Sequence, residues 1–158
     1  MILTRVLPLF TVISVFALDR FAKHWVRSDF LYGESRAILP FFNLTHIENT
    51  GAAFGMGQNM NTFFIGLSVV ILIVLFVLAR RLGKENIKLK IAFALVVGGA
   101  LGNLYDRIIQ GGVTDFLDFH LGNHHWPAFN VADSSIFVGA VLLAVLQWKS
   151  KAAEPVKS

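Results

Sequence analysis

The 158-residue sequence contains no cysteine, which excludes a disulfide framework, a thiolate metal site and a cysteine nucleophile. It is also poor in charge, because Asp, Glu, Lys and Arg make up 15% of the chain, against about 25% in an ordinary soluble domain. Apolar residues make up 55%, and the length is typical of one domain. This composition favours a single membrane-embedded domain over residues 1–158.

Four apolar stretches organise the chain. The second, from Thr62 to Ala79, has no charged residue and is long enough to span a bilayer. We therefore expect an α-helical membrane protein with transmembrane helices at about residues 6–26, 62–79, 89–105 and 131–148. The first stretch resembles a signal peptide, but no small-x-small cleavage pattern follows Ala17, so we expect it to be retained as a helix.

The distribution of positive charge predicts the orientation of these helices. The net charge is +4, but most basic residues flank apolar runs, so we do not expect a nucleic-acid partner. Five lysines and arginines lie between residues 80 and 90, and three lysines lie in the tail. Basic residues accumulate in cytoplasmic loops, so we expect both termini, the loop 80–88 and the tail 149–158 to be cytoplasmic. The segments of about 27–61 and 106–130 are then exoplasmic.

Acidic residues concentrate toward that exoplasmic side. Eight of the ten fall in the outer loops or the outer halves of helices: Asp19, Asp29, Glu34, Glu48, Asp106, Asp115, Asp118 and Asp133. Charge at a bilayer edge is costly and indicates a partner or a function. The aromatic and β-branched residues at 41–47 and 113–119 predict two short strands there, so we expect a small exoplasmic β-sheet beside the helices.

Asp115 and Asp133 are the favoured catalytic pair. Two neighbouring carboxylates do not both ionise readily, so one holds a proton near neutral pH. The ionised one can then deprotonate a water while the other donates to a scissile carbonyl. The same pattern also fits a structural interpretation, in which Asp133 caps the following helix and Asp115 is an ordinary loop carboxylate.

Two other aspartates compete with Asp115 for this role. Asp118 is three residues away on the predicted strand, where side chains alternate between faces, so only one of the two can meet Asp133. Asp106 is followed by Arg107, which favours a structural ion pair. Asp19 and Lys23 are four apart on one helix face and predict a membrane-embedded ion pair, which either braces the site or meets a polar group of a substrate.

Small and aromatic residues have less specific interpretations. Gly98 and Gly102 have the G-x-x-x-G spacing that permits close helix packing, and Asn103 beside them could hydrogen-bond across helices. The small residues from Asn49 to Ala53 are either a bare loop or a backbone surface for an extended peptide. Three tryptophans fit interfacial anchors: Trp25, Trp126 and Trp148. Three histidines near Asp115 and Asp118 allow a zinc site: His120, His124 and His125.

Five motifs in this order closely resemble the lipoprotein signal peptidase (signal peptidase II) family, from Asp19 to Gly139. They are Asp19-x-x-x-Lys23, Asn49-Thr50-Gly51-Ala52-Ala53-Phe54, Gly98-Gly99-Ala100-Leu101-Gly102-Asn103-Leu104-Tyr105-Asp106-Arg107, Val113-Thr114-Asp115-Phe116 and Phe129-Asn130-Val131-Ala132-Asp133-Ser134. One small departure is Thr114, where the family more often has Val.

The resemblance implies a bacterial inner-membrane aspartic endopeptidase that cleaves prolipoproteins just before a diacylglyceryl-modified cysteine. It implies that Asp115 and Asp133 are catalytic, without metal or organic cofactor, and that globomycin-type inhibitors bind. Residues implied to line or support the site are Asn49, Gly51, Asn103, Arg107, Asn130, Asp19, Lys23 and Asp106. We also expect contact with membrane lipids and a monomeric chain.

Two other classes of protein remain as alternatives. A small transporter or channel would need polar residues in the inner halves of several helices, and the second apolar stretch has none. A structural subunit would not need carboxylates and asparagines gathered at one face.

Overall fold

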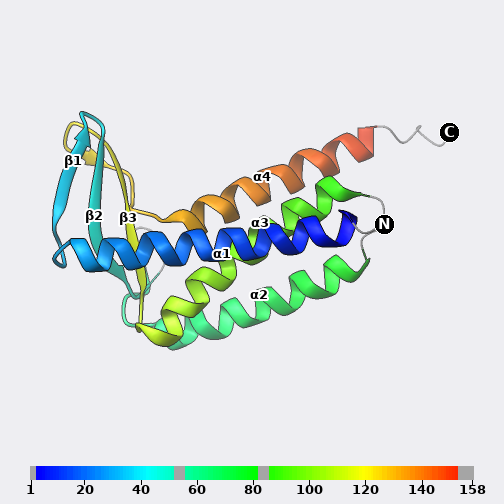
Figure 1. Ribbon diagram of the computed structural model, residues 1–158, viewed down its shortest axis with the longest axis horizontal. Helices are drawn as coiled ribbons and strands as arrows, with labels where there is room; N and C mark the ends of the chain where they lie inside the picture. Colours follow the sequence, from blue (N-terminus) through cyan, green and yellow to red (C-terminus); the bar gives the residue numbers. More distant parts are fainter. Residues whose placement is uncertain (1–2, 52–55, 82–85, 153–158) are drawn as a thin grey trace.

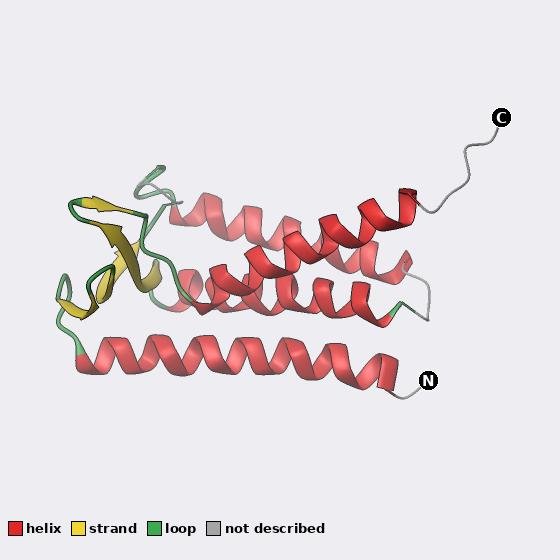
Figure 2. Cartoon of the chain, turned by 90° about the horizontal axis from the view of Figure 1, so that it is seen from above, coloured by secondary structure: helices red, strands yellow, loops and turns green. Residues whose placement is uncertain are grey.

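The structure, a computed structural model, describes residues 3–51, 56–81 and 86–152. Four long helices lie side by side, and a small sheet covers one end of them (Figures 1 and 2). The helices are α1 (Leu3–Asp29), α2 (Asn61–Arg81), α3 (Ile87–Ile109) and α4 (Val131–Ala152). The beginning of α1 and the end of α4 both lie at the end of the bundle farthest from the sheet (Figure 1).

All four predicted helices are present. In the described part of the chain, three segments are long and apolar enough to cross a membrane: Asn61–Arg80, Ile87–Ile109 and Val131–Trp148. The α1 helix is longer, at 27 residues, but its second half carries several charged side chains. Helices α1, α3 and α4 also continue past their predicted ends at residues 26, 105 and 148. These three helices therefore extend into segments that hydropathy alone predicted to be loops or tail.

Glycines on α3 let the neighbouring helices approach closely. A Cβ atom on Gly98 would lie 2.9 Å from the Val15 Cβ of α1, and one on Gly102 would lie 2.5 Å from the Asp19 Oδ2. A Cβ atom on Gly99 would collide with the Ala132 backbone oxygen of α4. The predicted close packing at the G-x-x-x-G motif is confirmed, since Gly98 and Gly102 allow α1 to approach α3. Gly99, which lies between these two glycines, allows α4 to approach.

The sheet has four antiparallel strands in the order β1-β2-β3-β4. Its strands are β1 (Ser35–Leu39), β2 (Phe42–Asn49), β3 (Val113–Leu121) and β4 (His124–His125). The two predicted strands correspond to β2 and β3. The flanking strands β1 and β4 were not predicted, since β1 is exposed along its whole length and β4 has only two residues.

A small apolar core joins the sheet to the helix bundle. It consists of Val26 and Phe30 at the end of α1, together with Phe116 of β3. Each of these side chains is at most 5% exposed. Because Phe116 is fixed in this core, its neighbour Asp115 is held where the sheet meets the helices.

Some predicted features lie outside the described residues. These are Ala52, Ala53 and Phe54 of the second motif, residues 82–85 of the predicted cytoplasmic loop, and the tail beyond Ala152.

Candidate active site

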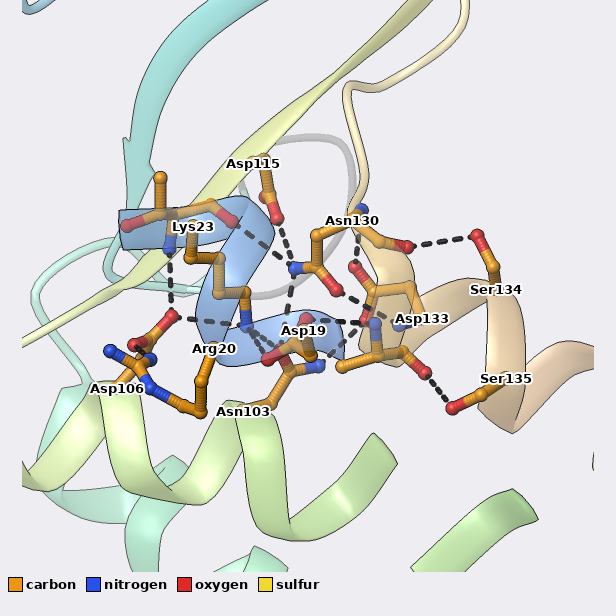
Figure 3. Close-up of polar contacts among 12 residues, drawn as sticks. Asp19, Arg20, Lys23, Asn103, Asp106, Asp115, Asn130, Asp133, Ser134 and Ser135 are labelled. Atoms are coloured by element: carbon orange, nitrogen blue, oxygen red, sulfur yellow. Dashed lines mark hydrogen bonds and ion pairs between the residues drawn. The ribbon is translucent and has the colours of Figure 1, made fainter. Parts of the chain in front are cut away.

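The predicted site residues gather where α3, α4 and β3 meet, close to the middle of α1. Figure 3 shows Asn130 between Asp115 and Asp133, with Lys23 and Asn103 beside them. Asp115 comes from β3, and Asp133 from the first turn of α4. Only β4 and a short loop separate these segments in sequence, and the return of the chain across β3 brings the two carboxylates together.

Asn130 connects the two carboxylates. Its side-chain Nδ2 donates to Asp115 Oδ1 at 2.7 Å, and its backbone N–H donates to Asp133 Oδ2 at 3.3 Å. Asn130 is fully buried and Asp115 is 3% exposed. One rigidly held residue therefore sets the relative position of both acids.

Asp133 is oriented by the start of α4. The Asn130 side chain accepts a hydrogen bond from the Asp133 backbone N–H at 2.9 Å. In turn, the Asp133 carboxylate accepts a hydrogen bond from the Asn130 backbone N–H. This reciprocal arrangement is a capping box. The helix cap is thus Asn130, and the alternative in which Asp133 itself is the cap is wrong. The second Asp133 oxygen accepts from Asn103 Nδ2 at 2.7 Å.

Asp115 is held on its other side by the end of β2. Asn49 Nδ2 donates to Asp115 Oδ2 at 3.1 Å, while Asn49 Oδ1 accepts from the Gly51 backbone N–H at 3.0 Å. A Cβ atom on Gly51 would collide with the Met56 backbone oxygen. The packing therefore requires glycine at position 51, and this supports the position of Asn49.

Burial gives Asp115 an unusual affinity for a proton. Loss of solvation, together with the nearby Asp133 carboxylate, raises the pKa of Asp115 to about 7. The hydrogen bonds from Asn49 and Asn130 and the charge of Lys23 oppose that rise in pKa. A carboxyl group with this pKa can hold or release a proton at neutral pH, as acid–base catalysis requires.

A buried cluster of charged residues adjoins the Asp115–Asp133 pair through Asn103. Lys23 Nζ contacts Asp19 Oδ2 at 2.8 Å and Asp106 Oδ2 at 3.0 Å, and all three side chains are fully buried. Lys23 also donates to Asn103 Oδ1 at 2.8 Å, and Asp19 Oδ1 accepts from the Ala132 backbone N–H at 2.9 Å. The predicted Asp19–Lys23 ion pair is confirmed, and it supports both α3 and the start of α4.

Asp106 forms ion pairs, as predicted, but its described partners differ from the expected Arg107. Besides Lys23, it pairs with Arg20, and with Arg27 at 3.5 Å. Arg107 points away from Asp106. Its Nη2 donates to the Gly51 carbonyl at 2.7 Å, and its Nη1 donates to Asn61 Oδ1 at 3.4 Å. Adjacent residues on a helix face different directions, which is why a pair of neighbours in sequence does not form here.

Asp118 does not share the Asn130 contact. It accepts from Asn43 Nδ2 at 3.0 Å and pairs with His125 Nδ1 at 2.8 Å. The predicted alternation of side chains along β3 is interrupted, because the backbone N–H groups of Phe116 and Leu117 both donate to the Phe129 carbonyl. This local irregularity has the hydrogen bonding of a β-bulge, and Asp115 and Asp118 line one cavity despite their spacing.

The histidines do not assemble a metal site in the described part of the chain. No three His, Asp or Glu side chains come together there as ligands for an ion. His120 instead stacks on His125, with ring centroids 4.8 Å apart.

Three adjoining cavities form a groove that passes the two carboxylates. The central cavity, of about 310 Å³, is lined by both Asp115 and Asp133 together with Asn49, Asn103 and Arg107. A sheet-side cavity of about 440 Å³ adjoins it, and Asp115 and Trp126 line both. A helix-side cavity of about 380 Å³ adjoins it at Asp133 and is lined mainly by Trp126, Phe129, Phe137 and Val138.

Sequence reasoning missed two groups of residues around the site. Arg20 and Arg27 follow the spacing of Lys23 on one face of α1, and this spacing was a usable signal. The segment from Trp126 to Phe129 lines the groove, but no local pattern indicates that it crosses the site.

Comparison with known proteins agrees with this arrangement. A family model described as signal peptidase (SPase) II matches residues 11–149. The lipoprotein signal peptidase of Serratia proteamaculans is 42% identical over 154 residues, covering 95% of this chain and 91% of the relative. That of Shewanella oneidensis is 46% identical over 136 residues, covering 84% and 80%.

Solved structures show the same fold. One described as a bacterial membrane enzyme superposes with a TM-score of 0.87 at 31% identity, covering 96% of this chain and 93% of that one. A second with the same description gives a TM-score of 0.80 at 32% identity, covering 89% and 91%. On the family match and these relatives, the chain belongs to the signal peptidase II family, the membrane-embedded peptidases that process lipoproteins.

Proposed function

We propose that this chain is an aspartic endopeptidase that removes signal peptides from diacylglyceryl-modified bacterial prolipoproteins, cutting just before the lipidated cysteine. The observation that carries the aspartic mechanism is the contact of one buried residue, Asn130, with both Asp115 and Asp133. Both carboxylates also line one cavity. Family membership supports the substrate class.

The proposed chemistry uses one proton shared by the two carboxyl groups. The ionised carboxylate removes a proton from a water lying between them, and the water oxygen attacks the scissile carbonyl carbon. The protonated carboxyl donates to the carbonyl oxygen, giving a neutral tetrahedral intermediate. Collapse of the intermediate breaks the C–N bond, and the amine leaves with a proton returned from the pair.

The other predicted site residues position this pair. Asn49, Asn103 and Asn130 each donate an amide hydrogen to one of the two carboxylates. Such donors favour the charged form of an acid, and those from Asn49 and Asn130 limit how far the pKa of Asp115 rises. We assign Arg107 and Gly51 to the shape of the groove on the α3 side, because Arg107 donates to the Gly51 carbonyl.

The buried charge cluster has a supporting role in this proposal. Lys23 compensates Asp19 and Asp106 and donates to Asn103. Removing one partner of a buried ion pair leaves a charge without compensation, which costs about 3–5 kcal/mol. We therefore assign these three residues to support of the site rather than to the chemistry.

We infer that α1 is a fourth membrane span of a single domain in the bacterial inner membrane. Its 27 residues correspond to about 40 Å of helix at 1.5 Å per residue, enough to cross a bilayer. The fully buried charges of Asp19 and Lys23 face α3 and α4, and the apolar Phe10, Ile13 and Phe21 are exposed. Four spans then place the sheet outside and both termini in the cytoplasm.

The helix-side cavity supplies a place for the hydrophobic part of the substrate. It lies along α4 beside Asp133, and its lining is mainly aromatic and aliphatic. A lipid-modified peptide that remains in the bilayer would present its scissile bond at a fixed depth, where the two carboxylates lie. Membrane lipids and globomycin-type inhibitors are the other partners in this proposal, and the chain acts as a monomer.

A cleavage assay tests this function directly. The purified chain should cleave a diacylglyceryl-modified prolipoprotein before its lipidated cysteine, with unmodified prolipoprotein cleaved at least about tenfold more slowly, because the lipid contributes binding in the helix-side cavity. A chelator should leave the rate unchanged. Equal cleavage of both substrates would contradict the substrate class, and inhibition by the chelator would contradict the proposed chemistry.

A further inference from the structure

We propose that the sheet-side cavity binds the first residues of the mature lipoprotein, and that Glu48 and Asp118 make it select against acidic residues there. The proposal rests on the proposed function, because it extends the same groove. It concerns residues that follow the lipidated cysteine, beyond the bond that is cut.

The two ends of the groove differ in their surroundings. The helix-side cavity lies along the membrane-spanning helix α4, where Phe137 is 70% exposed beside it. The sheet-side cavity is built instead by β2, β3, residues 125–128 and Gln58. A hydrophobic signal peptide and acyl chains belong in the first of these environments, so the mature chain must leave through the second.

The central cavity makes these two ends continuous. Asn49 and Asp115 line both it and the sheet-side cavity, and so do Trp126, Pro127 and Ala128. A peptide whose scissile carbonyl lies between Asp115 and Asp133 therefore extends directly into the sheet-side cavity. At about 440 Å³, that cavity has the size of an ordinary small-ligand pocket, enough for a few residues of extended peptide.

The charges around the sheet-side cavity are mainly negative. Its lining includes Glu48 and Asp118 in addition to Asp115, and in the described part of the chain no lysine or arginine lines it. Among the described residues, the one basic group in its lining is His125, which contacts Asp118 at 2.8 Å. Glu48 is exposed, and no ion pair of its side chain occurs among the described residues. Like charges brought together at a binding surface reduce affinity and slow association.

Three lipopeptides that differ only in the second to fourth residues of the mature sequence test this selectivity. One carries lysines, one serines and one aspartates at these positions. We expect kcat/KM of the full-length protein to decrease from lysine to serine to aspartate, by roughly fivefold or more over the series at low salt. Raising the salt concentration should compress the difference.

The variants Glu48→Gln and Asp118→Asn identify the source of the selectivity. In the double variant the lysine-to-aspartate ratio of kcat/KM should fall to within about twofold of unity, and Glu48→Gln alone should reduce it. Asp29→Asn is the matched control, because Asp29 is an exposed carboxylate outside the groove that pairs with Arg36, and it should keep the wild-type ratio. The ratio is internal to each preparation, so partial loss of folded protein cancels.

Two results would overturn this inference while leaving the proposed function intact. One is equal cleavage of the three lipopeptides by the wild-type protein. The other is a wild-type ratio that persists in the double variant. Failure to cleave any of the three would overturn the proposed function as well, so the two failures are distinguishable.

Discussion

At the scale of single residues, the site depends on how one asparagine is used. Asn130 caps α4 with its side-chain oxygen and holds Asp115 with its side-chain nitrogen. Replacing it with aspartate would keep the cap but add a third carboxylate, while alanine would remove both contacts. The requirement for a buried residue that donates and accepts at once explains why an amide is needed between two acids.

The raised pKa of Asp115 predicts how cleavage depends on pH. Since its pKa is raised to about 7 by burial and by Asp133, the carboxyl is protonated below pH 7 and loses its proton above it. Two ionised carboxylates lack the acid that the mechanism needs. We expect kcat/KM on a lipopeptide to fall about tenfold per pH unit above the pKa of the pair. The variant Asp115→Glu should change the pH at which this fall begins.

One result of the pH profile would contradict the proposed role of the shared proton. A value of kcat/KM that is constant from pH 6 to pH 9 would show that the pair does not lose a required proton in this range. Thermal unfolding of the same protein over the same range separates a loss of acid catalysis from a loss of fold.

At the scale of helices and strands, periodicity and hydropathy predicted the four helices and the two central strands. They did not predict where the helices end, because charged residues at the ends of α1 and α3 pair with each other inside the fold. Arg27 and Asp106 were predicted to lie in loops and are helical in the structure. A hydropathy profile assumes that charged side chains are solvated, whereas these side chains form ion pairs inside the fold.

The two central strands, β2 and β3, were also predicted from sequence only in part. The alternation of β3 predicted opposite faces for Asp115 and Asp118, but the bulge at Phe116 and Leu117 brings both to one cavity. A bulge depends on the segment that pairs with the strand, here Phe129, and this partner is not local in sequence. The residues of the proposed catalytic pair could be picked out from family motifs, whereas the sheet-side cavity could be found only in three dimensions.

At the scale of the whole molecule, the groove runs from the helix bundle to the sheet at one end of the protein. In the proposed four-span orientation, that end is outside the cytoplasm, and the loop 80–88 is on the cytoplasmic side. The absence of native cysteine makes this orientation easy to test. His124, which is exposed on β4, and Lys88, at the start of α3, lie at opposite ends of the proposed orientation.

Single-cysteine variants should therefore label from opposite sides of the membrane. In intact cells, a membrane-impermeant thiol reagent should label His124→Cys, and it should label Lys88→Cys only after the membrane is permeabilised. The two variants serve as controls for each other. Labelling of Lys88→Cys alone in intact cells would reverse the proposed orientation.

The central claim is that the carboxyl groups of Asp115 and Asp133 activate one water between them. The most direct measurement is kcat/KM for a lipidated prolipoprotein with Asp115→Asn and Asp133→Asn, each checked for folding by thermal unfolding, with Asp29→Asn as control. We predict a loss of about 10²–10⁴-fold in each dyad variant and a control within twofold of wild type. Turnover of folded Asp133→Asn protein at the wild-type rate would contradict the account.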